Sequence, residues 1–110
     1  MLLDAQHENG YIKGTMNLQF EWDEQKNAAN QKNHDVSCEE AKTVFYDDDA
    51  RLIADPEHSQ HEDRFILVGM SYNLRMLTVV HCHRQDEEII RIISARKATR
   101  HEAQAYIRRK

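Results

Sequence analysis

Apolar and polar residues alternate at the start of the patterned part of the chain. Leu18, Phe20 and Trp22 are separated by polar residues, which predicts a strand with one buried face. Asp23 follows as a good helix N-cap, and residues 24–33 form a polar segment compatible with an exposed helix. The chain therefore begins its folded part with a short strand that leads into a helix.

A second helix is predicted by the motif Ser37-Cys38-Glu39-Glu40, which has the spacing of a capping box. In this helix the apolar residues Ala41, Val44 and Phe45 would face the core, and the acidic run at 47–49 would end it. A third helix should start at Thr99-Arg100-His101-Glu102, which has the same capping spacing.

Between the second and third helices the pattern predicts four strands. Short turns at 72–75 and 85–87 would force antiparallel pairing of the strands that they join. The predicted strands are Arg51–Ala54, Arg64–Ser71, Met76–His83 and Glu88–Ala95. The resulting order, β-α-α-β-β-β-β-α, predicts an α+β fold with helices packed on an antiparallel sheet.

The chain has 110 residues, a length that suits a single domain with one modest core. Residues 1–17 show no clear period and hold two of the three glycines, so we expect a weakly ordered N-terminal extension and a single domain at 18–110. The apolar runs are far too short to span a membrane, and the N-terminus lacks the pattern of a secretory signal. We therefore expect a cytoplasmic protein whose two cysteines are reduced thiols.

Charge is distributed unevenly along the chain. Overall it carries 15 Lys and Arg against 19 Asp and Glu, a net charge of −4. Residues 89–110 hold seven basic residues and one acidic, which is +6, while the other 88 residues hold 8 basic and 18 acidic, which is −10. A basic segment on an acidic body indicates a polyanionic ligand such as nucleic acid, or else a solvated C-terminal helix.

Residue types that bind metals occur without the spacing of a metal site. His81-Cys82-His83 would place two imidazoles on one side of a strand, and His58 and His61 lie in a predicted loop. No residue completes a tetrahedral zinc set at a characteristic spacing, and the acidic run at 47–49 suits a solvated loop. We therefore expect no metal and no cofactor.

One helix stripe and several arginines could carry chemistry. Lys26, Asn30 and His34 are spaced i, i+4, i+8 and could grip a phosphate and move a proton, or form a solvated polar face. Arg64 begins one predicted strand and Arg91 lies inside another, where a guanidinium is costly unless it faces solvent, a carboxylate or a ligand. Arginines that converge from adjacent strands would suit a metal-free ribonuclease, which needs cations for the phosphorane charge.

The residues also resemble the BrnT family of bacterial toxin–antitoxin modules from Leu18 to about Tyr106. The markers in the first half are Trp22-Asp23 with Lys26, Asn30 and His34, and Asp55-Pro56 with His58-Ser59. The later markers are Glu62-Asp63-Arg64-Phe65, Gly69, Arg91-Ile92-Ile93-Ser94-Ala95-Arg96, Ala98, Glu102 and Tyr106. The family usually has Lys-His-Gly where this chain has Asn33-His34-Asp35, so Asp35 would have to adopt the left-handed conformation of that glycine.

The resemblance implies a ribonuclease toxin with the fold of RelE-like and ParE-like toxins. It also implies neutralisation by a BrnA-like antitoxin with a ribbon-helix-helix domain, so that operator DNA is bound only through the complex. The alternative is a non-catalytic module that binds nucleic acid or protein through its basic segment, because a fold alone does not decide function.

The mechanism that we expect is metal-independent endoribonuclease cleavage that arrests growth. Lys26, Arg64, Arg91 and Arg96 would hold the phosphate, and His34 is the first candidate for proton transfer. Glu62 is a weaker candidate, as is Tyr106. Further contacts with RNA are expected from Asn30, Arg75, Lys97, Arg100 and Tyr106.

Overall fold

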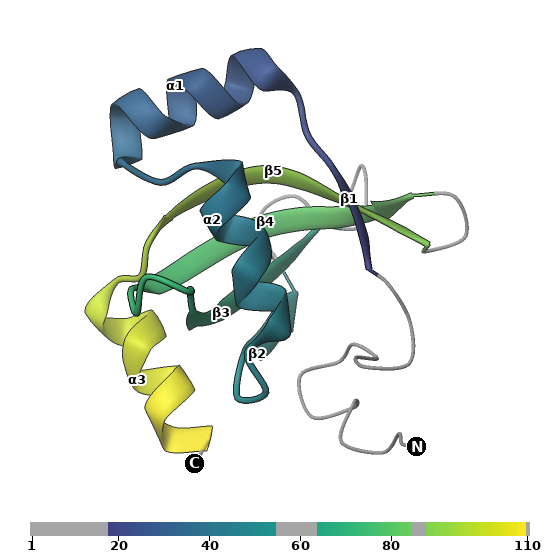
Figure 1. The fold of residues 1–110 in the computed structure, drawn as a ribbon. Helices are drawn as coiled ribbons and strands as arrows, with labels where there is room; N and C mark the ends of the chain where they lie inside the picture. Colours follow the sequence, from purple (N-terminus) through teal and green to yellow (C-terminus); the bar gives the residue numbers. More distant parts are fainter. Residues whose placement is uncertain (1–17, 55–63, 85–87, 110) are drawn as a thin grey trace.

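A computed structural model describes residues 18–54, 64–84 and 88–109 of the chain. The expected extension at 1–17 and the turn at 85–87 lie outside these ranges. In chain order the elements are β1 (Gln19–Glu21), α1 (Glu24–His34), α2 (Cys38–Thr43), the 3-10 helix η2 (Val44–Tyr46), β2 (Arg51–Ala54), β3 (Phe65–Met70), β4 (Met76–Arg84), β5 (Ile89–Lys97) and α3 (Arg100–Arg109). This confirms the α+β class, with η2 as an additional turn after α2 (Figure 1).

The sheet has five strands in the order β1-β5-β4-β3-β2. Strands β2 to β5 pair antiparallel, which the short turns predicted for β3 with β4 and for β4 with β5, but β1 pairs parallel with β5. The prediction of a wholly antiparallel sheet was therefore wrong at this edge. The reason is that β1 and α1 follow one another along the same side of β5: Glu21 is paired with Arg91, and Asn30 in α1 bonds Ala95 further along the strand (Figure 1).

The helix boundaries agree with their sequence signals. The Asp23 carboxylate accepts bonds from two backbone N–H groups of the first turn of α1, and the Ser37 hydroxyl accepts one from Glu40. Thr99 and Glu102 form the predicted capping box, each side chain accepting a bond from the backbone N–H of the other. Asp35 ends α1 at φ 61°, the left-handed conformation expected from its position.

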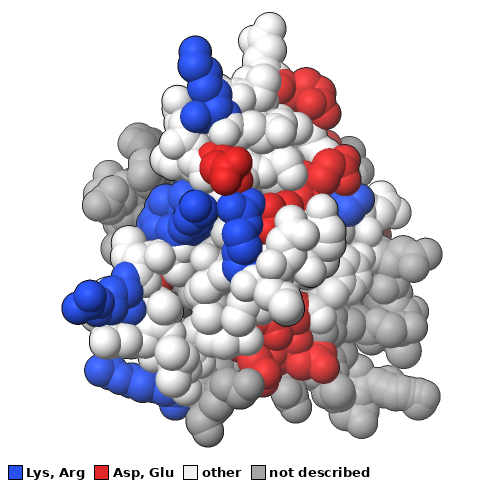
Figure 2. All heavy atoms as spheres, turned by 60° about the vertical axis from the view of Figure 1, so that its left-hand side comes forward, with Lys and Arg blue, Asp and Glu red and all other residues white. Residues whose placement is uncertain are grey.

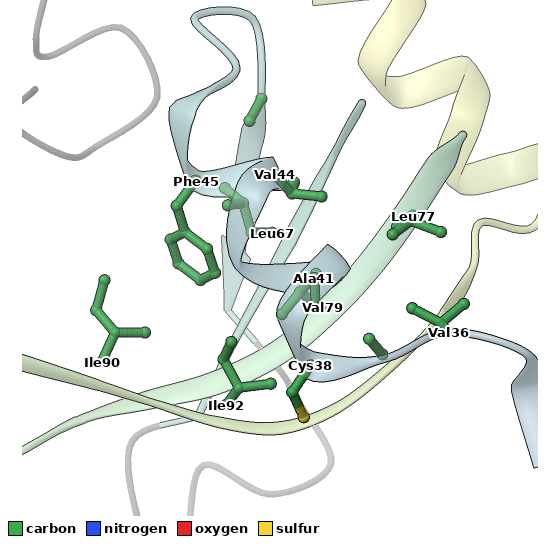
Figure 3. Packing of buried hydrophobic residues seen from close by; sticks show 12 residues of the cluster. Val36, Cys38, Ala41, Val44, Phe45, Leu67, Leu77, Val79, Ile90 and Ile92 are labelled. Carbon is green, nitrogen blue, oxygen red and sulfur yellow. The ribbon is translucent and has the colours of Figure 1, made fainter. Parts of the chain in front are cut away.

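The core lies between one face of the sheet and the layer formed by α2 and η2 (Figure 3). Its fully buried residues include Ala41, Val44 and Phe45, as the sequence predicted. Close approach of η2 to β3 requires Gly69, since a Cβ there would lie 2.9 Å from the Ala50 Cβ and 3.0 Å from a Val44 methyl group. Leu18, Phe20 and Trp22 pack against the edge of this cluster, which confirms the alternating pattern of the first strand.

Helix α3 packs against β3 and β2, and its first turn is bonded to β4 through Thr78, which donates to Glu102. Among the described residues, no helix is long and apolar enough to cross a membrane.

Candidate functional site

A β-bulge decides which residues of β5 share a face. Arg91 and Arg96 are five residues apart, so a regular strand would point them to opposite faces. The register with β4 shifts between Val80 and His81, which leaves Ile93 as an extra residue in β5. Arg91 is therefore paired with Cys82 and Arg96 with Thr78, two β4 residues that lie on one face. We call this the arginine face; it is opposite the face covered by α2.

At the C-terminal end of β5, Arg96 is held by a single carboxylate. Its two terminal nitrogens donate to the two oxygens of Glu102 at 2.8 and 2.9 Å. Glu102 also accepts bonds from the Thr78 hydroxyl and the Thr99 backbone N–H. Mainly because of the Arg96 bonds, the pKa of Glu102 is lowered to about 2, and that of Arg96 is raised by the same bonds. The Arg96–Glu102 pair has no net charge, and it joins β5 to α3.

At the N-terminal end of β5, two arginines share one carboxylate. Arg91 donates to Glu21 Oε2 at 2.8 Å, and Arg84 Nε lies 2.6 Å from the same oxygen. The three residues come from β5, β4 and β1 and stand on the arginine face. Unlike the Arg96 pair, this cluster has a net charge of +1. Sequence reasoning missed Arg84 and Glu21, although the alternation of β4 and the position of Glu21 in β1 offered a signal.

Arg64 stands one residue before β3. The register of β3 with β4 pairs Phe65 with His81, and its continuation by one residue sets position 64 beside Cys82, which is paired with Arg91. Positions 64, 82 and 91 thus form a row across three strands, so the sheet brings Arg64 toward the Arg91 end. The other catalytic candidate from this region, Glu62, lies outside the described residues, as do His58 and His61.

The predicted stripe of Lys26, Asn30 and His34 on α1 contains one buried residue and two exposed residues. Asn30 is buried; its amide donates to the carbonyl groups of Val36 and Ala95, and its oxygen accepts the Ala95 N–H at 3.1 Å. It thus pairs with the edge of β5 as a strand would; a contact between Asn30 and RNA stays a prediction. Lys26 and His34 are exposed, and His34 lies at the end of α1, beyond the contact with Ala95. Among the described residues, no hydrogen bond or ion pair joins either of them to Arg91.

Two further residues expected to contact RNA have structural roles in the fold. Arg75 donates to the Glu40 carboxylate and, at 2.8 Å, to the Asp35 carbonyl, which joins the β3–β4 turn to α2. Tyr106 is buried, and its hydroxyl donates to Asp47 Oδ2 at 2.9 Å. The same oxygen accepts the Met70 N–H, so Asp47 joins α3 to β3.

The basic residues of segment 89–110 differ in their surroundings, although they lie close together in the sequence. Lys97 and Arg100 are exposed at the C-terminal end of β5, while Arg91 and Arg96 are ion-paired. Figure 2 shows the side of the molecule where α1 ends and α3 begins: Lys and Arg stand in separate groups, with Asp and Glu beside some of them. Neighbours in space, which the sequence does not reveal, therefore cancel part of the +6 charge counted along the chain.

The histidines of β4 belong to the aromatic part of the core. His81 is fully buried and packs edge-on against Phe45 at 4.8 Å between ring centroids. Burial lowers its pKa to about 3, so it is neutral at physiological pH. As predicted, His81 and His83 lie on one side of the strand, with 5.6 Å between their ring centroids. In the described ranges, no group of three His, Cys, Asp or Glu residues is arranged to hold a metal ion.

Comparison with known proteins places these features in a family. The model of the ribonuclease toxin BrnT of type II toxin–antitoxin systems matches residues 22–102. The chain belongs to this family. Its fold is similar to the crystal structure of the Brucella abortus ribonuclease toxin BrnT, with a TM-score of 0.59 and 19% identity over 76% of this chain and 100% of that one. A search of curated proteins found no match. The family match includes β5, Arg84 and the Arg96–Glu102 pair, and it begins one residue after Glu21.

Proposed function

We propose that this BrnT-family chain is a metal-independent endoribonuclease that arrests growth. The observation that supports this best is the net positive cluster at the N-terminal end of β5, where Arg91 keeps most of its N–H donors available. A guanidinium offers five donors in a fork that matches phosphate, and a fixed cation stabilises the charge that develops during phosphoryl transfer. The RelE-like and ParE-like relationship of the fold is part of the same proposal.

In the proposed mechanism Arg91 and Arg64 hold the scissile phosphate and stabilise the pentavalent phosphorane. The 2′-hydroxyl loses its proton and attacks the phosphorus, and the 5′-oxygen leaves with a proton, which produces a 2′,3′-cyclic phosphate end. Glu62 is the candidate proton acceptor because it precedes Arg64 by two residues. His34 remains the alternative for a reaction centre at the other end of β5.

Arg96 is the weaker catalytic candidate in this proposal. Thr78 and Cys82, the partners of Arg96 and Arg91, are four residues apart, which corresponds to about 13 Å along the strand. Held by Glu102 and Glu21, the two guanidinium groups would contact different phosphates of one RNA strand. Lys97 and Arg100 would bind the flanking RNA, and Lys26 would make an outer contact from α1.

The test is to incubate the purified full chain with naked RNA in the presence of EDTA. We expect cleavage to continue and the products to carry 2′,3′-cyclic phosphate. Activity that disappears with EDTA and returns with Mg²⁺ or Zn²⁺ would contradict the metal-free mechanism. Binding without cleavage, in the presence or absence of metal, would support the non-catalytic alternative.

We also propose that a BrnA-like antitoxin neutralises the chain by covering the arginine face with an acidic helix. Charge complementarity favours this location, since the cluster of Arg84, Arg91 and Glu21 on this face is net cationic. Operator DNA would then bind to the ribbon-helix-helix domain of the antitoxin, so that the complex binds DNA and the isolated chain does not.

A further inference from the structure

Three neighbouring strands each place one charged residue of a single cluster on the arginine face. Glu21 in β1 is paired with Arg91 in β5, and Arg84 reaches the same carboxylate from β4. All three are accessible, with 49% of the Arg84 side chain, 36% of the Arg91 side chain and 30% of the Glu21 side chain exposed. Both arginines contact Glu21 Oε2, so their head groups point to one place.

Stability alone does not explain the second arginine. One guanidinium would neutralise Glu21, whereas two guanidinium groups repel each other and leave a charge of +1. Exposed ion pairs contribute little to stability, too little to require such an arrangement. Each guanidinium gives one nitrogen to Glu21, which leaves most of its donors without a protein partner among the described residues.

We propose that Glu21 holds Arg84 and Arg91 as a two-arginine phosphate clamp. Arg84 is then a phosphate-binding residue for RNA, and Glu21 is a positioning residue that acts through both guanidinium groups. The clamp rests on the proposed ribonuclease function and extends its RNA-binding site to β4 and β1. A carboxylate suits the positioning role because one of its oxygens contacts two long side chains and leaves most of their donors unused.

The experiment measures binding of the full chain to a 2′-O-methyl oligoribonucleotide, which lacks the attacking hydroxyl and is not cleaved. Binding constants are measured over a series of salt concentrations. For single strands, each phosphate contact contributes about −0.7 to the slope of log K against log salt. Arg84→Ala should make this slope shallower by about 0.7 and weaken binding, and Arg84→Lys should keep the slope because it keeps the charge.

Lys42→Ala is the matched control. It removes the same charge from α2, on the opposite side of the sheet, where Lys42 is paired with Glu39. Its slope should equal that of the unmodified chain. Glu21→Gln tests the positioning role: removal of the negative charge alone would tighten RNA binding, whereas loss of the clamp geometry should weaken it. Circular dichroism of each variant verifies that the fold is retained.

The outcomes separate the clamp from the proposed function. An unmodified chain that cleaves RNA, with an Arg84→Ala slope equal to that of Lys42→Ala, would overturn the clamp and leave the ribonuclease intact. A chain that binds without cleaving, with the shallower Arg84→Ala slope, would support the clamp and refute the ribonuclease. No binding to the oligoribonucleotide by the unmodified chain would refute the clamp, and tighter binding by Glu21→Gln would refute the role of Glu21.

Discussion

The two ends of β5 carry the same residue type in different electrostatic settings. At the C-terminal end Arg96 is matched by one carboxylate that bonds both of its terminal nitrogens, and the pair joins β5 to α3. At the N-terminal end Arg91 competes with Arg84 for one oxygen of Glu21. An arginine in a strand is therefore not evidence of a ligand site by itself. The number of arginines that share one carboxylate decides whether an arginine holds the protein together or remains able to hold an anion.

The largest expected effect is on catalysis. Arg91→Ala should lower the rate of RNA cleavage by about 10²–10³-fold, the usual consequence of removing one group that stabilises transition-state charge. Arg96→Ala, assayed under conditions in which the variant is folded, should lower the rate of RNA cleavage by less than about 10-fold, because Glu102 already neutralises Arg96. Single-turnover cleavage of one RNA by both variants measures this difference. A larger loss of cleavage rate in folded Arg96→Ala would indicate that the reaction centre lies at the C-terminal end of β5, near His34.

Stability should show the reverse order. Arg96→Ala leaves the Glu102 carboxylate, whose side chain is 17% exposed, without its main partner and should cost about 1–3 kcal/mol in the free energy of unfolding. Arg91→Ala leaves Glu21 paired with Arg84 and should cost at most about 1 kcal/mol. Urea denaturation of the two variants tests this. Equal losses would mean that the N-terminal cluster also holds the fold together.

Acid unfolding should sharpen the role of Glu102. Its pKa is lowered in the folded protein from 4.5 to about 2, so its stabilisation is fully present above pH 4.5 and is lost as pH falls toward 2. The stability of Glu102→Gln should therefore fall less steeply over this window than that of the unmodified chain. Urea denaturation at a series of pH values measures the slopes, with Glu39→Gln as an exposed control. Identical slopes for Glu102→Gln and the unmodified chain would contradict the stabilising role of the Arg96–Glu102 pair.

The smallest expected effect concerns association with a BrnA-like antitoxin. If an acidic helix covers the net cationic end of β5, Arg91→Ala should slow association severalfold at low salt and reduce its dependence on salt. Arg96→Ala should change the association rate less, because Glu102 already cancels its charge. Stopped-flow or surface-binding kinetics can compare the two. Association that is insensitive to both substitutions would place the antitoxin elsewhere.

Local signals in the sequence were sufficient for most of the elements. Capping residues, alternation and short turns act between neighbours along the chain, so Asp23, Ser37 and Thr99 marked the helix starts correctly. The left-handed conformation of Asp35 followed from the resemblance, since the BrnT family usually has a glycine at this position and Asp tolerates that conformation better than most residues. The family followed from many spaced residue matches in one order, and the match of its model to residues 22–102 confirms it.

The tertiary structure decided how the helices and strands pair and pack with one another. No local rule reveals that Asn30 replaces a strand at the edge of β5, that β1 runs parallel to it, or that a bulge turns Arg91 and Arg96 to one face. The pairing of each arginine with a carboxylate likewise joins residues far apart in sequence, as with Glu21 and Arg91. Sequence by itself determined where charge is carried; strand register and packing determined where it is cancelled, because electrostatic energy depends on distance in space and not along the chain.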